Sequence, residues 1–74
     1  MDSGMRYIEV DSDILRAVGY DHQRKILEIE FRNGHIYQYT DVPEREYQSL
    51  IIAMSKGKYF LQKIDGQYRF VRVR

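Results

Sequence analysis

Alternation of apolar and polar residues is clearest over residues 26–32. Leu27, Ile29 and Phe31 face one side of an extended chain, and the glutamates between them face the other. A period of two residues is typical of a half-buried strand. Asn33-Gly34 follows directly, and this dipeptide favours a tight turn between antiparallel strands. The pattern therefore predicts a β-hairpin whose second strand begins just after the turn.

The second strand, residues 35–40, can pair with the first in two registers. A two-residue loop would place Tyr37 and Tyr39 among the glutamates. A three-residue loop with Gly34 in the left-handed conformation pairs Ile29 with Tyr37, which puts both tyrosines beside the apolar side chains. Because a slip of one residue moves every side chain to the other face, we favour the register that separates polarity better. We predict that both tyrosines support the core; the alternative is an exposed stacking platform.

Two further strands are predicted before the hairpin, over residues 5–10 and 14–20. The segment between them is Asp11-Ser12-Asp13, and these residue types favour turns because their side chains bond nearby backbone N–H groups. The first half of the chain therefore reads as a series of strands joined by short polar connections.

After the hairpin the pattern becomes helical. Pro43 is expected at the first helical position, where its missing N–H costs nothing. Ser55-Lys56-Gly57 is expected to end this helix, with Gly57 adopting a positive φ. A second helix over 58–64 and a strand over 67–74 complete the chain. The side chains expected to be buried are Tyr47, Leu50, Ile51 and Met54 in the first helix and Phe60, Leu61 and Ile64 in the second.

These elements predict an α+β fold. Its parts are an antiparallel sheet of three to five strands and a two-helix hairpin packed on one face. The order is β-β-β-α-α-β, with room for an extra strand at the N-terminus. At 74 residues, the chain is expected to form a single domain over residues 1–74.

An ordered set of positions, rather than any one specific motif, resembles a known family. The set comprises Val10, Ser12, Ile14, Gly19-Tyr20-Asp21, Leu27, Ile29, Phe31, Gly34, Tyr37, Tyr39, Val42-Pro43, Ala53, Ser55, Gly57, Phe60, Ile64 and Tyr68. Together these positions, spanning residues 10–70, resemble the KTSC domain. That family is named for its occurrence at the C-terminus of some lysyl-tRNA synthetases, and it also occurs as a stand-alone bacterial protein. Asp13 departs from the family pattern, which has a second small polar residue there.

The resemblance implies a domain of uncharacterised function for which RNA binding has been suggested from the synthetase context. It also implies that Tyr37, Tyr39, Gly34, Pro43 and Gly57 belong to the structural motif of the family.

Catalytic chemistry is not expected from this chain. It has no cysteine, which excludes thiolate metal sites and cysteine nucleophiles. His22 and His35 are the only histidines, and no carboxylates stand near them at metal-ligand spacing. No serine lies in a nucleophile elbow. We therefore predict no enzyme activity, no metal site and no cofactor.

Charge is distributed unevenly along the chain. Residues 1–53 carry six basic and ten acidic side chains, whereas residues 54–74 carry six basic side chains and Asp65 alone. Such asymmetry points to an acidic partner for the last third of the chain. The alternative is that the two segments lie side by side in the fold and neutralise each other.

The best candidate for binding is the second helix. Lys56, Tyr59 and Lys63 fall at i, i+3 and i+7 and share one stripe, which combines charges for phosphates with a ring for a base. The alternative is a solvated helix whose tyrosine packs on its neighbour. The residues predicted to contact nucleic acid are Lys56, Lys58, Tyr59, Lys63 and Arg69.

RNA is therefore the predicted partner, and another protein or a second copy of the chain is the alternative. No membrane partner is expected, because no apolar run approaches the length of about 18 residues that a membrane span needs. The first six residues show no secretory pattern, and the lack of cysteine fits a reducing compartment. The predicted localisation is the cytoplasm.

Overall fold

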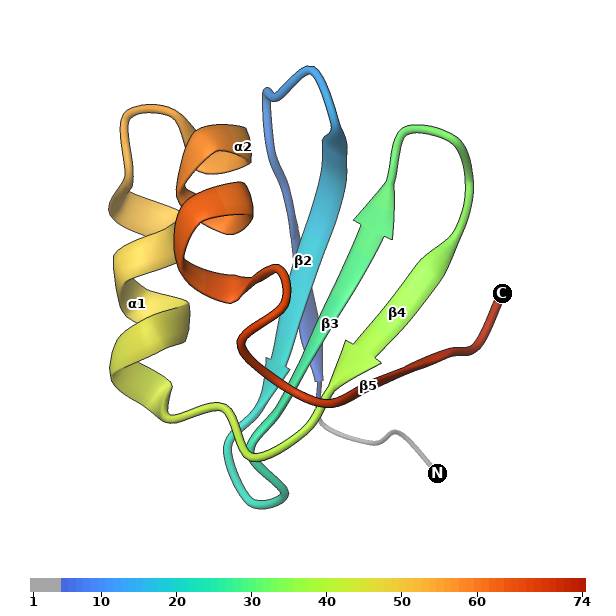
Figure 1. Cartoon of the computed structure of the whole chain (residues 1–74), viewed down its shortest axis with the longest axis vertical. Helices are drawn as coiled ribbons and strands as arrows, with labels where there is room; N and C mark the ends of the chain where they lie inside the picture. The colour runs from blue at the N-terminus through green and yellow to red at the C-terminus, as the bar shows by residue number, and fades with distance from the viewer. Residues whose placement is uncertain (1–4) are drawn as a thin grey trace.

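Five antiparallel strands form one sheet in which the order in space is the order in the sequence, β1-β2-β3-β4-β5. The helical segment lies between β4 and β5 in the chain and packs on one face of the sheet (Figure 1). This arrangement confirms the predicted α+β fold, and the additional N-terminal strand is present. The elements are β1 (Arg6–Glu9), β2 (Leu15–Asp21), β3 (Ile26–Phe31), β4 (Ile36–Tyr39), α1 (Glu44–Ile52), α2 (Lys56–Tyr59), a π-helical turn η1 (Phe60–Ile64) and β5 (Phe70–Arg72).

The computed structural model describes residues 5–74. The first four residues, on which part of the argument against a secretory signal rested, lie outside the described residues.

The β3–β4 hairpin has the predicted three-residue loop. Leu27 lies opposite Tyr39 and Ile29 lies opposite Tyr37. Gly34 adopts a φ of 94°, a left-handed conformation in which a residue with a side chain would be strained. The Phe31 N–H donates to the His35 carbonyl oxygen at 2.9 Å, which closes the loop. The predicted register of the hairpin is thus confirmed, and the aromatic side chains of β4 face the helices.

Tyr39 is the largest fully buried side chain and lies at the centre of the core, with 2% of its surface exposed. Its ring contacts that of Phe60 from η1 at a centroid distance of 5.8 Å. Tyr37, by contrast, is only partly buried. The sheet and the helical segment therefore share one apolar core, whose fully enclosed members are Leu15, Val18, Leu27, Ile29, Val42, Leu50 and Ile64.

The connection between the helices differs from the prediction. The first helix ends at Ile52, and the Ala53 N–H donates to the Leu50 carbonyl oxygen. Met54 therefore lies beyond the helix and is fully exposed instead of continuing the buried face. The apolar periodicity continues to Met54, whereas the backbone leaves the helix at Ala53. The periodicity alone therefore wrongly predicted that Met54 is buried.

Gly57 was predicted to end the first helix at a positive φ, but it lies inside α2 and has no positive φ. A close tertiary contact explains why this position requires a glycine. A Cβ atom there would lie 3.0 Å from the Ser12 Oγ and 3.1 Å from the Ile14 Cγ1. The glycine thus allows α2 to approach the turn before β2.

Leu61 was predicted to be buried and is exposed. Phe60 and Ile64 occupy the core-facing side of η1, as predicted. One residue further along a helix is a rotation of about 100°, so a side chain directly after Phe60 points away from the core. The final strand is also shorter than predicted, although Val73 and Arg74 still hydrogen-bond to the backbone of Ile36.

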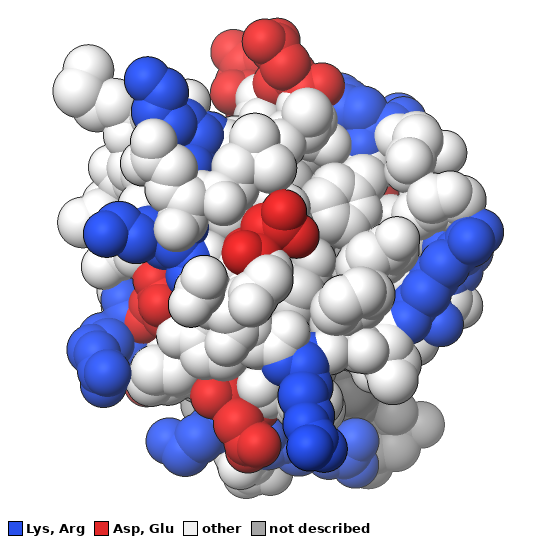
Figure 2. Space-filling view, viewed as in Figure 1, with Lys and Arg blue, Asp and Glu red and all other residues white. Residues whose placement is uncertain are grey.

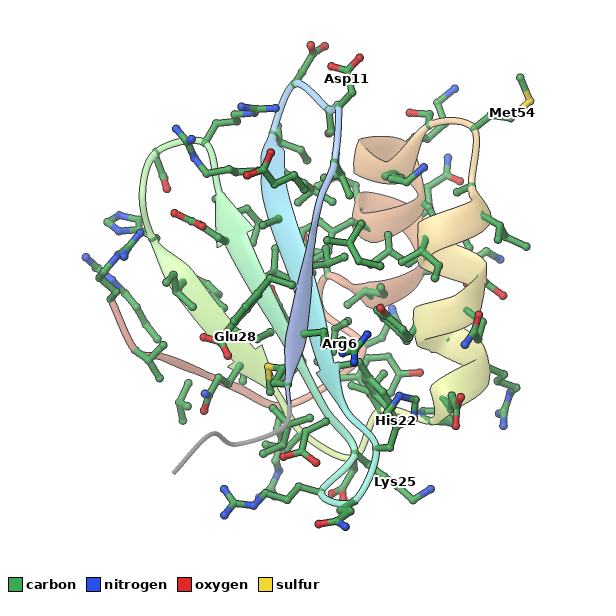
Figure 3. The ribbon with its side chains drawn as sticks, turned by 180° about the vertical axis from the view of Figure 1, so that it is seen from behind. Arg6, Asp11, His22, Lys25, Glu28 and Met54 are labelled. Carbon is green, nitrogen blue, oxygen red and sulfur yellow. The ribbon has the colours of Figure 1, made fainter. Side chains whose placement is uncertain are left out.

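The sheet face opposite the helices carries the glutamates of β3. Figure 3 shows Glu28 on this face. Although it is charged, Glu28 is 7% exposed, and its Oε1 accepts a hydrogen bond from the Tyr7 hydroxyl. The Tyr7 ring reaches it across Gly19, where a Cβ atom would lie 2.8 Å from the ring. Burial and the neighbouring carboxylate raise the pKa of Tyr7, so the hydroxyl stays protonated as the donor.

We expect Tyr39→Ala to lower the free energy of unfolding by about 2–4 kcal/mol, because it removes a buried aromatic ring and leaves a cavity. Urea denaturation measures this change. The neighbouring substitution Gln38→Ala, on the other face of β4, is the control and should change stability by less than about 0.5 kcal/mol. Equal effects of the two substitutions would contradict the placement of Tyr39 in the core.

Candidate binding face

Five of the six basic side chains in the last third of the chain form no ion pair among the described residues, and four of them are predicted phosphate contacts. Lys56 and Lys58 lie on α2, Lys63 lies on η1, and Arg69 lies just before β5. Among residues 5–74 the ion pairs are Arg16–Glu30, His22–Glu44, Arg24–Asp21 and Arg74–Glu30. Lys56 alone of the four is engaged, since its Nζ donates to the Ala53 carbonyl oxygen at 3.0 Å. Direct ion pairs among the described residues therefore leave these four side chains unpaired.

The basic side chains do not form one continuous patch on the face that includes the helices. Figure 2 shows Lys and Arg in separate groups around the rim of this view, with uncharged and acidic side chains between them. Scattered cations make few simultaneous phosphate contacts, so this arrangement favours weak, salt-sensitive attraction over tight binding.

Tyr59 has a structural contact in the fold. Its hydroxyl donates to Oε2 of Glu46 on α1, and the side chain is partly buried against the core. Burial and the Glu46 carboxylate raise its pKa. The Tyr68 hydroxyl donates to the other oxygen of Glu46 at 2.7 Å, and burial with the same carboxylate raises the pKa of Tyr68 to about 12. Glu46 thus holds both the helical segment and the approach to β5 against α1.

A groove of about 510 Å³ lies between the β1–β2 turn and the helical segment. Ser12 and Gly57 meet at this groove. Figure 3 shows Asp11 and Met54 at the same end of the molecule, on the two sides of that gap. Carboxylates stand on the turn and lysines on the helix, with apolar side chains between them. The groove is lined by Asp11, Ser12, Asp13, Ile14, Met54, Ser55, Lys56, Gly57, Lys58, Leu61 and Gln62.

The edge of the sheet brings Phe70 and Arg72, which are not among the residues predicted to contact nucleic acid, beside Tyr37. Phe70 on β5 is 50% exposed, and its ring stacks on Tyr37 with a centroid distance of 4.8 Å and an interplanar angle of 5°. Arg72 lies opposite Tyr37 in the β4–β5 ladder. The alternation Phe70-x-Arg72 in a predicted strand indicated that these two side chains share a face of the sheet. Which face they occupy depended on the pairing of β5 with β4.

Pro43, predicted at the first helical position, precedes α1 as its N-cap with extended backbone. The segment before it is fixed by Tyr20, whose hydroxyl donates to the Val42 carbonyl oxygen at 2.5 Å. Of the motif positions, Tyr39, Gly34, Pro43 and Gly57 thus have clear structural roles in the core, the hairpin turn, the helix start and the α2 contact.

In residues 5–74, no group of three or more histidine or acidic side chains has an arrangement that could hold a metal ion. His22 lies 3.3 Å from the Glu44 carboxylate, on the surface of the β2–β3 connection. No helix of the described chain has the length and apolar character required to cross a membrane.

Comparison with known proteins finds one family and several relatives. The KTSC domain family matches residues 11–68. An uncharacterised protein of Stutzerimonas stutzeri is 40% identical over 70 residues, which is 93% of this chain and 99% of that protein. A lysine–tRNA ligase of Nostoc punctiforme is 30% identical over 63 residues, covering 85% of this chain but 11% of the ligase. The crystal structure of a KTSC domain protein from Yersinia pestis superposes with a TM-score of 0.91 at 38% identity, covering 96% of this chain and all of that one.

We expect Tyr59→Phe to lower the free energy of unfolding by about 1–2 kcal/mol, because it removes a hydrogen bond to a carboxylate while keeping the ring. Chemical denaturation measures the loss. In a Glu46→Gln background the same substitution should cost clearly less, since the charged acceptor is already gone. A Tyr59→Phe protein as stable as wild type would show that the hydroxyl contact contributes nothing.

Proposed function

The chain belongs to the KTSC domain family, and we propose that it is a non-catalytic module that binds RNA weakly through the basic side of its helical segment. The observation that carries this proposal is the set of basic side chains on α2, η1 and the approach to β5 that form no ion pair among the described residues. Neutralising RNA phosphates with such side chains releases condensed counterions, which favours association.

The relatives support this choice of partner. Three of them are named as lysine–tRNA ligases, proteins that act on a tRNA, and the matched region is a small part of each. A module found both within a tRNA-directed enzyme and as a separate chain is expected to contribute binding to RNA, while the remainder of the ligase supplies the chemistry. The cytoplasm stays the predicted compartment.

Roles can be assigned within the face. Lys58, Lys63 and Arg69 form no ion pair within residues 5–74 and are the proposed phosphate contacts. Lys56 contributes its charge from a fixed position, because its ammonium group already donates to a backbone carbonyl. Tyr59, the predicted stacking residue, instead secures the segment to α1 through Glu46. We therefore propose that the helical segment supplies electrostatic attraction and that Tyr59 keeps it in place.

Replacing Lys58 and Lys63 together with Glu should weaken binding to every RNA sequence alike. The slope of log affinity against log salt should fall by about 1.4, which is the loss of two phosphate contacts on a single strand. Fluorescence anisotropy with a short single-stranded RNA at two salt concentrations measures both effects.

The matched control is Arg24→Glu with Lys25→Glu, the same change of charge at the β2–β3 turn. Figure 3 shows Lys25 at the end of the molecule opposite Met54 and the helix connection. The control pair should lower affinity much less than the helix pair. Equal losses would mean that overall charge governs binding and that the helical face has no special part. An absence of binding by wild type at low salt would refute the RNA proposal.

Self-association is a second candidate function, and a separate observation favours it. Met54 and Leu61 are exposed apolar side chains that line the groove, together with carboxylates from the β1–β2 turn and lysines from α2. Under a two-fold axis, the acidic turn of one copy can meet the lysines of the other, because an isologous interface needs a surface complementary to itself. A second copy of the chain is thus the occupant that this groove suits.

If the groove joins two copies, the mass measured by sedimentation equilibrium should rise with protein concentration. Met54→Asp together with Leu61→Asp should keep the protein monomeric, because both changes place a charge among the apolar side chains of the groove. Val71→Asp, at an exposed apolar position on the far strand β5, is the control and should leave association unchanged. Wild type that stays monomeric at millimolar concentration would exclude this function.

A further inference from the structure

On the helix-side face of β4 and β5, the Phe70 ring packs on Tyr37 on one side and is exposed on the other. Phe70 lies parallel to Tyr37, and Tyr37 is held in turn by an edge contact with Phe31 at 5.2 Å. The helices cover the neighbouring strands, and β5 lies at the uncovered edge of the sheet (Figure 1). Phe70 therefore remains 50% exposed, while its stacking on Tyr37 fixes the orientation of the ring.

The charges around this ring favour an anion. Strand alternation puts Glu28 and Glu30 on the opposite face of the sheet, where they bond to Tyr7 and Arg74. Arg72 shares the face of Tyr37 through their pairing and forms no ion pair among the described residues. An acidic group also acts on this face: burial, followed by the charge of Asp65, raises the pKa of the Tyr39 hydroxyl.

From this juxtaposition we propose that Phe70 is a stacking site for an unpaired nucleobase, with Arg72 beside it to contact the adjoining phosphate. This inference rests on the RNA binding proposed above and adds the class of RNA. A base inside a duplex has both faces covered by its neighbours, so only a single-stranded or looped-out base can lie on the ring. The face therefore selects single strands over duplex, whereas the lysines of α2 and η1 attract both.

The test compares two RNAs with each protein variant, namely an oligoadenylate of about 12 nucleotides and a hairpin duplex with the same number of phosphates. Phe70→Ala should weaken binding of the single strand by about 5- to 100-fold and leave duplex binding nearly unchanged. Phe70→Leu keeps apolar packing on Tyr37 without an aromatic face, so it should show the same selective loss in a folded protein. Phe70→Tyr should bind as wild type does.

Val71→Ala is the matched control, because Val71 lies on the opposite face of β5 and is 55% exposed, nearly the same as Phe70. It should change neither affinity. Asp65→Asn should tighten single-strand binding, because it removes a carboxylate whose charge acts on Tyr39 of this face. A 2-aminopurine placed in the single strand reports stacking directly, and its fluorescence should be quenched by wild type and Phe70→Tyr but not by Phe70→Leu.

The outcomes separate this inference from the proposed function. If wild type binds neither RNA at low salt, both fail. If the Lys58 and Lys63 reversals weaken binding but Phe70→Leu binds and quenches as wild type does, the stacking site is refuted and the electrostatic RNA module stands. Equal loss of duplex and single-strand binding in Phe70→Leu would likewise overturn the assignment.

Discussion

The register of the β3–β4 hairpin is the constraint on which the rest of the molecule depends. Gly34 at a φ of 94° closes a three-residue loop, and this loop puts Tyr39 opposite Leu27. A loop shorter by one residue would reverse every side chain of β4. The core would then lose its largest buried ring, and the glutamates would share a face with the aromatic residues. Both the stability of the fold and the charge of its helix-side face follow from this one turn.

A second interaction connects that core to the candidate binding face. Glu46 on α1 accepts hydrogen bonds from the hydroxyls of Tyr59 and Tyr68, one on each carboxylate oxygen. These two tyrosines flank the segment from the end of α2 to the start of β5. One carboxylate therefore fixes the segment in which Lys63 and Arg69 lie, while their own charges stay unpaired. Stability and the proposed binding would use different side chains of the same stretch, so we expect the lysines to be replaceable without disturbing the fold.

The two proposed contacts with RNA differ in what they recognise. The lysines of α2 and η1 offer charge, which any phosphate backbone satisfies, whereas the Phe70 ring offers a surface that only an unpaired base can reach. Their combination would give a small module modest affinity together with a preference for exposed bases.

Local patterns along the chain were sufficient to predict the strands, the hairpin register, the two helical segments and the uneven charge, because each depends on residues near one another in sequence. The same patterns failed for Met54, Leu61 and Gly57. Their environments depend on where the backbone leaves α1 and on how closely α2 approaches Ser12 and Ile14. The sequence predicted that Tyr59 is an aromatic residue on a basic helical stripe. The acceptor of its hydroxyl, Glu46, comes from another helix and could not be predicted from that stripe. The open face of Phe70 likewise exists only because β5 pairs with β4 at the edge that the helices leave uncovered, an arrangement set by long-range packing and not by any local signal.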